Sequence, residues 1–296
     1  MPEAGPAKWP LLAELPESQA SGAIRHIYAQ IKQLSAVPMV ALIYRHMATI
    51  PCALEWSWAV VEPVMRAGLL QQRAWQLAAA ALVPHQLAIP RAALQASGLN
   101  GADVRAIAGV LDAYNRANPV NIMVVRCLAL HLAGAVDPVT VAAALPPWQP
   151  PAQPPALPDM IDPPAMTPTV RELALLLTDR RVGGAPSTLW PSLYRHLAYW
   201  PAFLGLATVM VPPAFAAIDE AAARLRRQID DSAAALARRM TPPPHLAPPS
   251  AEHRRQLQAA IEQFSARIPE MVVIGTLLRR ALPHDIQLPQ EAPSEH

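Results

Sequence analysis

The sequence predicts an all-α fold in which two homologous helical repeats of about 130 residues each form an intramolecular pseudo-dimer around a central cavity. Hydrophobic residues make up 52% of the chain and charged residues 16%, with only three Phe. This Ala- and Leu-rich composition, with few alternating β-branched or aromatic runs, is typical of helices packed on helices. The length of 296 residues suits two units of ordinary domain size.

A motif that occurs twice is the main sign of duplication. Tyr-Arg-His at 44–46, followed by a proline at 51, recurs at 194–196 with a proline at 201, an offset of 150 residues. Residues 114–119 and 264–269 match at the same offset. Several matches in one register indicate an internal repeat. We therefore divide the chain into a first repeat (1–136), a linker (137–168) and a second repeat (169–296), with a ligand site expected where the repeats meet.

In the first repeat, helices are predicted from apolar spacing and from the prolines that interrupt it. Residues 1–20 hold four prolines and little periodicity, and are interpreted as a loose lead-in. Ile24, Ile27 and Ile31 form the apolar stripe of the first helix, with Ser21 as its N-cap. Pro119 is expected to separate the last two helices, because proline disfavours a helical residue before it. The predicted helices are 22–36, 38–49, 52–65, 66–82, 89–98, 103–117 and 119–135.

The linker is predicted from 11 prolines between residues 138 and 168. Such a density favours extended polyproline structure, either as a spacer between the repeats or as a ligand for an aromatic groove. The second repeat is expected to begin with a helix near 169 and a loop at 183–186. A long helix follows at 215–239, then a second linker at 242–249. The final helix pair, within 252–282, is expected to break before Pro269.

Composition excludes several functions. The net charge is only +2, without a basic stripe, so nucleic acid is not an expected partner. Two distant cysteines and the lack of a signal pattern indicate a cytoplasmic protein. Residues 197–218 carry no charge, but prolines at 201, 212 and 213 interrupt them, so no membrane segment is expected. We find no metal-binding motif and no phosphate or dinucleotide loop, so neither a metal nor another cofactor is expected.

A site for one small ligand must differ between the repeats, and this criterion selects three residues. Asn118 stands opposite Ile268, Ser192 opposite Leu42, and Leu193 opposite Ile43. Asn118 either caps a helix or contacts a ligand or water. Ser192 either bonds locally to the backbone or faces the site.

The repeated Arg-His pairs, at 45–46 and 195–196, permit two interpretations. They either lock the repeats together or present arginines that anchor a carboxylate. Either role would place them where the two repeats meet.

Four short segments carry a resemblance to a known family. They are Val-Pro-Met-Val-Ala-Leu at 37–42, Ala-Thr-Ile-Pro at 48–51, Ala-Tyr-Asn at 113–115 before Asn118 and Pro119, and Leu-Ala-Tyr-Trp-Pro at 197–201. Together they resemble the group I 2-haloacid dehalogenases, an all-helical family that acts on both D- and L-2-haloacids. The resemblance implies direct hydrolysis, in which an aspartate and an asparagine activate the water that displaces halide with inversion.

The resemblance also implies site residues. It places the catalytic asparagine at Asn118 and the catalytic aspartate at a position that holds Leu193 in this chain. The substrate-binding positions would be Met39, Ala41, Leu42, Asn121, Pro191 and Ser192. Since leucine accepts no proton, Asp179 or Glu270 would have to supply the base.

Three functions follow from these expectations. The chain is either a hydrolase of a small 2-substituted carboxylic acid, a non-catalytic protein that binds such an acid or an apolar ligand, or a helical scaffold. A homodimer is left open. The distance between Asn118 and a carboxylate is the feature that would separate hydrolysis from binding.

Overall fold

The computed structural model describes residues 12–83, 88–137, 148–178, 181–182, 185–186, 189–242, 244 and 246–283. In the first repeat the helices are α1 (Gly22–Ser35), α2 (Leu42–Met47), α3 (Ala53–Arg66), α4 (Leu69–Ala80), α5 (Arg91–Ala96) and α6 (Gly101–Leu132). In the second they are α7 (Pro168–Thr178), α8 (Ser192–Leu197), α9 (Pro201–Met210), α10 (Phe215–Ala237) and α11 (Ala251–Ala281). The all-α prediction is confirmed.

Short elements complete the chain. Three 3₁₀ turns are present: η1 (Glu17–Gln19), η2 (Pro163–Ala165) and η3 (Pro212–Ala214). Two-residue strands, β1 (Arg181–Val182) and β2 (Ala185–Pro186), pair antiparallel where the sequence predicts a loop.

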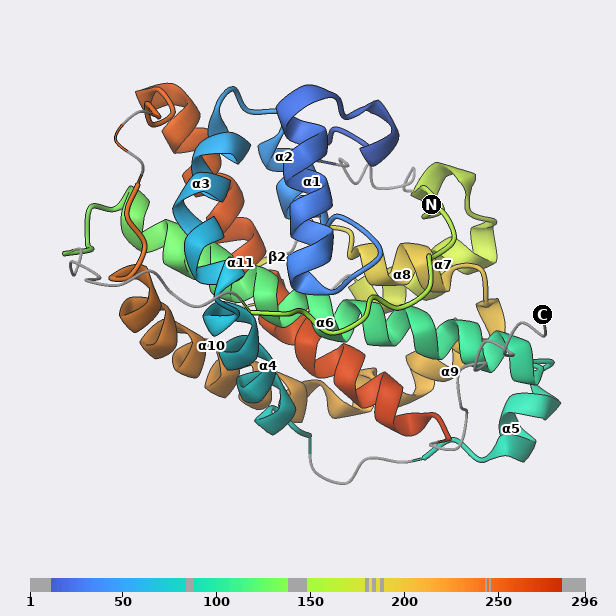
Figure 1. Cartoon of the computed structure of the whole chain (residues 1–296). Coiled ribbons are helices and arrows are strands. Elements are labelled where there is room, and N and C mark those ends of the chain that lie inside the picture. Colours follow the sequence, from blue (N-terminus) through green and yellow to red (C-terminus); the bar gives the residue numbers. More distant parts are fainter. Residues whose placement is uncertain are drawn as a thin grey trace, which may run out of the picture.

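Two long helices, α6 and α11, lie side by side through the middle of the molecule (Figure 1). The helix α10 packs against both of them, α4 packs against α6 and α10, and α8 packs against α6. One continuous apolar core runs through both repeats. The two halves of the chain are therefore interlocked, because α6 and α11 pack mainly against each other.

The start of α6 is strongly specified by its sequence. The Asn100 side chain accepts hydrogen bonds from the backbone N–H groups of Ala102 and Asp103, and the Asp103 carboxylate accepts one from the Asn100 N–H. This reciprocal capping box satisfies N–H groups that a helix start otherwise leaves unpaired.

The predicted helix breaks at Pro119 and Pro269 are wrong, because both prolines lie inside continuous helices. A proline in a helix interior leaves the carbonyl four residues earlier without its helical partner and clashes with it. Burial compensates here, since Pro119 and Pro269 are both buried in helices that pack against each other, α6 and α11. Tertiary packing therefore overrides a local signal that is usually sound.

A second correction concerns residues 38–41, where the sequence predicts the start of a helix. The helix α2 begins only at Leu42, and Ala41 before it has an extended backbone. The Val40 N–H donates instead to the Glu17 carboxylate, at 2.7 Å. This side-chain acceptor, remote in sequence, takes the place of a helical one.

The spacing of the elements agrees with the predicted offset. The helices α2 and α8 begin at residues 42 and 192, and α6 and α11 begin at 101 and 251. Each of these pairs is 150 residues apart, as the sequence motifs are. The proposed boundaries of the repeats, 1–136 and 169–296, stay a prediction.

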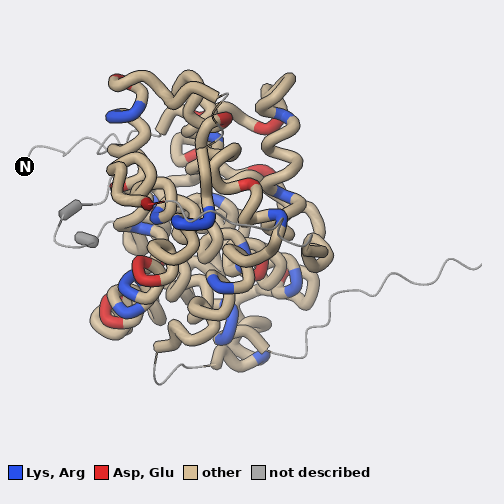
Figure 2. Tube along the Cα trace, turned by 60° about the vertical axis from the view of Figure 1, so that its left-hand side comes forward, with Lys and Arg blue, Asp and Glu red and all other residues tan. Residues whose placement is uncertain are grey.

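Charged residues of both signs are interspersed over the molecule (Figure 2). Among the described residues one stretch, 201–237, is long and apolar enough to cross a membrane by length and composition. A core helix of a soluble protein passes the same test, so length and composition alone do not identify a membrane segment.

Candidate functional site

A cavity of about 500 Å³ is lined by segments from both halves of the chain. This volume is within the range of sites that hold small molecules. Its walls come from residues 14–18, the segment around α2, the middle of α6, residues 156–160, the start of α8 and the middle of α11. The cavity is therefore made by both repeats and by the segment that joins them.

All eight site residues predicted from the sequence line this cavity. They are Met39, Ala41, Leu42, Asn118, Asn121, Pro191, Ser192 and Leu193. Segments far apart in the chain bring them together, namely the approach to α2, the middle of α6 and the first turn of α8. Their individual roles stay predictions.

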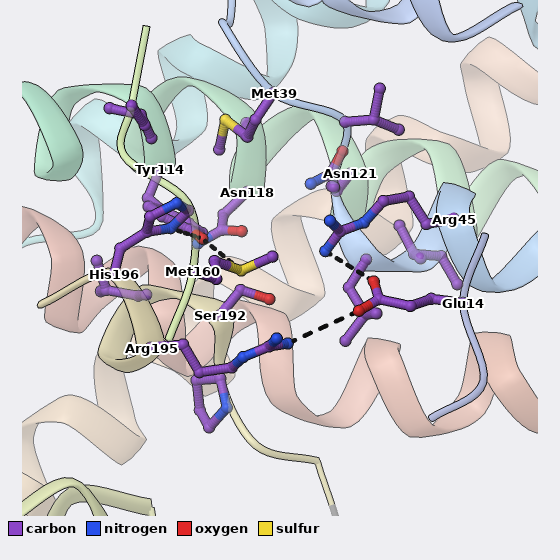
Figure 3. Close-up of a pocket in the computed structure, with 18 of the residues that line it drawn as sticks. Glu14, Met39, Arg45, Tyr114, Asn118, Asn121, Met160, Ser192, Arg195 and His196 are labelled. Carbon is purple, nitrogen blue, oxygen red and sulfur yellow. Dashed lines mark hydrogen bonds and ion pairs between the residues drawn. The ribbon is translucent and has the colours of Figure 1, made fainter. Parts of the chain in front are cut away.

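Asn118 and Asn121 lie three residues apart on α6 and thus on one face of it (Figure 3). The cap predicted for Asn118 is wrong, because this residue is in the helix interior. Within the described part of the chain, neither side-chain amide forms a hydrogen bond. Both amides are therefore available to a ligand or a water molecule.

Leu193 is only 1% exposed, and it gives the cavity an apolar side chain where the resemblance places an aspartate. Of the two predicted substitute acids, Asp179 lies outside the described residues. Glu270 is buried and pairs with Arg267, Nη1 to Oε2 at 2.8 Å. Arg267 lines the cavity but Glu270 does not, so this glutamate is a structural partner of the arginine.

The arginines of the two repeated motifs both line the cavity and point toward one carboxylate, Glu14 (Figure 3). Arg45 Nη2 lies 2.9 Å from Glu14 Oε2, and Arg195 Nη1 lies 4.0 Å from Glu14 Oε1. Arg195 also pairs with Asp162. The two arginine residues are 9% and 3% exposed, so their charges are largely shielded from water.

Glu14 is a site residue that the sequence analysis missed. It lies in the segment interpreted as a loose lead-in, whose described part is held in place. The Leu15 N–H donates to the Arg45 carbonyl at 3.0 Å, and the His46 Nδ1–H donates to the Ala13 carbonyl at 2.7 Å. No local pattern marks Glu14, because its partners are distant in sequence.

A hydrogen-bonded chain of side chains forms another wall of the cavity. His196 Nε2 lies 3.0 Å from the Pro158 carbonyl, which can only accept, so Nε2 carries the proton. The other nitrogen, Nδ1, therefore accepts from the Tyr114 hydroxyl at 2.7 Å. Ser192 lines the same cavity (Figure 3).

Burial determines the protonation of this chain. Desolvation, with smaller contributions from Arg195 and Arg45, lowers the pKa of His196 to about 4. Desolvation also raises the pKa of Tyr114 well above its usual value. At neutral pH both side chains are therefore uncharged, with His196 a neutral acceptor.

The described part of the linker is not a simple spacer. The Trp148 N–H donates to the Arg66 carbonyl, and Arg116 donates to the Ala152 carbonyl. Residues 148–162 follow α6, in yellow-green in Figure 1, and contribute Pro158, Asp159 and Met160 to the cavity. We call residues 148–162 the strap. As the proline count predicts, residues 148–162 form no helix, but the count does not show what the segment covers.

Among the described residues, no group of three or more His, Cys, Asp or Glu side chains could hold a metal ion. The cavity is lined by three arginines, one histidine and three carboxylates. They are Arg45, Arg195, Arg267, His196, Glu14, Glu17 and Asp159.

Comparison with protein-family models finds no match, and neither does comparison with curated proteins. Solved structures match well in shape. One is a D-2-haloacid dehalogenase in complex with L-LA, at a TM-score of 0.70 and 17% identity. Another is a mutant D-2-haloacid dehalogenase in complex with D-2-CPA, at 0.65 and 18%. Each match covers 92% of this chain and 96% of the other. The chain therefore has the fold of the D-2-haloacid dehalogenases.

Proposed function

We propose that this chain is a 2-haloacid dehalogenase that binds a small 2-substituted carboxylic acid in the cavity and hydrolyses its carbon–halogen bond. One observation carries the proposal. In a fold shared with D-2-haloacid dehalogenases, every position that the family resemblance assigns to the site lines a single cavity of suitable volume. We place this activity in the cytoplasm, without a cofactor.

The charges of the cavity suit an acid as ligand. Arg45 and Arg195 reach it from opposite repeats, and arginine binds carboxylates through paired hydrogen bonds. Met39, Leu42 and Leu193 supply an apolar wall against which carbon and halogen pack. An anionic head and an apolar 2-substituent match these two parts of the cavity.

Hydrolysis needs a group that accepts a proton from water. Of the cavity carboxylates, Glu14 pairs with Arg45, and Glu17 pairs with Lys32 and accepts from Val40 N–H. Asp159 on the strap is exposed and near enough to His196 for its charge to act on that ring, and within the described part of the chain it forms no hydrogen bond or ion pair. We assign it the role of base. Asn118 orients the water, which attacks C2 as halide leaves, and Asp159 takes the water's proton.

A second candidate is binding of the same acids without chemistry. The observation that favours it is that Leu193, which accepts no proton, lines the cavity at the position where the resemblance places an aspartate. The two candidates share the ligand and differ only in turnover, so one experiment separates them.

The experiment measures halide release from both enantiomers of 2-chloropropionate. The wild type should release chloride, and Asp159→Asn should lower the rate by about 10²-fold or more, as expected for loss of a general base. Asp231→Asn removes the same charge from an exposed surface position and should change nothing.

Activity in Leu193→Asp with none in the wild type would support the second candidate, an intact cavity without its base. Full activity in Asp159→Asn would show that Asp159 is not the base. No release by the wild type, Leu193→Asp or Asp159→Asn would overturn the hydrolase proposal.

A further inference from the structure

Arg45 and Arg195, the arginines of the two motifs, make the same two kinds of contact. The Leu15 N–H donates to the Arg45 carbonyl, and the Ile161 N–H donates to the Arg195 carbonyl. Each arginine also pairs with a carboxylate of the segment that precedes its own Tyr-Arg-His motif: Arg45 with Glu14 and Arg195 with Asp162. Each repeat therefore has its own arginine–carboxylate pair.

The two carboxylates differ in where they lie. Asp162 is not part of the cavity wall, and its side chain is 58% exposed. Glu14 lines the cavity, is 23% exposed, and extends to within 4.0 Å of the other repeat's arginine as well. Glu14 is thus an anion inside the cavity, positioned between two guanidinium groups (Figure 3).

The arginines keep unused binding capacity. The Nε of Arg45 and the Nε of Arg195 are buried and have no hydrogen-bond partner among the described residues. A buried donor without an acceptor is unfavourable, and an arginine with Nε and an Nη free can bind a carboxylate by two bonds. Each arginine therefore keeps a donor that Glu14 leaves unsatisfied.

Glu14 can leave the arginines without unfolding its segment. The backbone around it is held independently, by the Leu15 N–H on Arg45, by the Tyr28 hydroxyl on the Leu15 carbonyl, and by His46 on the Ala13 carbonyl. A side-chain rotation is enough to withdraw the carboxylate, because these bonds involve only the backbone of residues 13 and 15.

We propose that Arg45 and Arg195 form a carboxylate site that Glu14 fills while the cavity is empty, and that an incoming acid binds by displacing the Glu14 side chain from it. This inference rests on the proposed function, whose ligand it concerns. Glu14 is then an internal competitor, which keeps two buried cations neutralised and excludes weakly binding anions. Its presence multiplies the apparent affinity for an acid by the fraction of time that Glu14 leaves the site free.

The test is calorimetric titration of the full chain with lactate and with 2-chloropropionate. Glu14→Gln removes the competing charge and keeps the shape of the side chain. Glu14→Gln should bind both acids at least about tenfold more tightly than the wild type, which corresponds to a site filled for nine-tenths of the time. The neutral amide of lactic acid should bind the wild type and the variant equally.

Glu252→Gln is the matched control. It removes one negative charge from an exposed pair with Arg255, about 18 Å along α11 from the nearest cavity residue, Phe264. The affinity of this variant for both acids should equal that of the wild type. If Glu252→Gln gained as much affinity for the acids as Glu14→Gln, the effect would come from net charge alone. That result would overturn the proposal that Glu14 competes with the acid.

The outcomes separate this inference from the proposed function. Binding by the wild type that is equally tight, or weaker, in Glu14→Gln would overturn the competition and leave an acid-binding cavity in place. Loss of chloride release in Glu14→Gln with unchanged affinity would also overturn it, by making Glu14 a catalytic base. Absence of acid binding in both proteins would overturn the inference and the proposed function together.

Discussion

Equivalent residues of the two repeats have different tasks because their neighbours differ. His46 donates from Nδ1 to the Ala13 carbonyl at the edge of the fold. His196 accepts from Tyr114 at Nδ1 and donates from Nε2 to Pro158. The sequence shows the same Arg-His pair twice, yet only the second histidine lines the cavity. The two copies of the motif therefore have different surroundings.

His196 should make stability depend on pH. Its folded pKa of about 4 is below the ordinary 6.5, so the unfolded chain binds a proton that the folded chain refuses. The contribution of His196 to the free energy of unfolding is fully present above pH 6.5. It is lost as the pH falls toward 4. The expected loss is about 2 kcal/mol between pH 8 and pH 5. Urea unfolding across this range measures it.

The variant His196→Gln tests the assignment. It should be less stable than the wild type at pH 8, because the Tyr114 hydroxyl and the Pro158 carbonyl lose their partner. Its stability should fall less steeply between pH 6.5 and pH 4. His26→Gln changes an exposed histidine and should keep the wild-type slope. An unchanged slope in His196→Gln would contradict the prediction.

At the scale of elements, the strap depends on one close approach of backbone to side chain. Gly68 precedes α4 with a φ of +71°, and a Cβ there would lie 2.3 Å from the Trp148 ring. The Trp148 ring also stands beside Trp75, with 6.0 Å between ring centroids. Glycine at 68 is therefore needed both for its positive φ and for the space that Trp148 occupies.

Gly68→Ala should consequently loosen the start of the strap. We expect a loss of roughly 2–4 kcal/mol in the free energy of unfolding, from left-handed strain together with the displaced ring. Hydrogen exchange of the Trp148 N–H, which donates to the Arg66 carbonyl, should become faster.

Gly134→Ala separates these two causes. Gly134 has a φ of +65°, but a Cβ added to it would meet nothing within 4 Å, so the substitution adds strain alone. It should cost about 1 kcal/mol and leave exchange at Trp148 unchanged. Equal losses of unfolding free energy in Gly68→Ala and Gly134→Ala would mean that the contact with Trp148 does not contribute to stability.

At the scale of the molecule, polar bonds tie the repeats together around the central helices. Arg126 pairs with Asp230, and Arg279 pairs with Asp112. The Ile89 N–H donates to the Ala281 carbonyl at 2.8 Å. These bonds, with the continuous core, connect elements more than a hundred residues apart in sequence.

The two repeats should therefore unfold together. Urea unfolding is expected to give one transition, with the same midpoint by tryptophan fluorescence and by far-ultraviolet circular dichroism. Val124→Ala, in the buried face of α6, should shift this single midpoint without splitting it. Two separate transitions would show that each repeat is a stable unit by itself.

The sequence by itself determined the helical class and the 150-residue register, which follow from composition, apolar spacing and short motifs that recur. The resemblance to the group I 2-haloacid dehalogenases added eight site residues, all of which line the cavity. Only the tertiary structure decided that helices continue through Pro119 and Pro269, because burial against a distant helix stabilises what local sterics oppose. It also decided that Glu14 and Asp159 share the cavity with Arg45 and Arg195. The partners that position these charges are remote along the chain, so no local sequence pattern predicts that they come together.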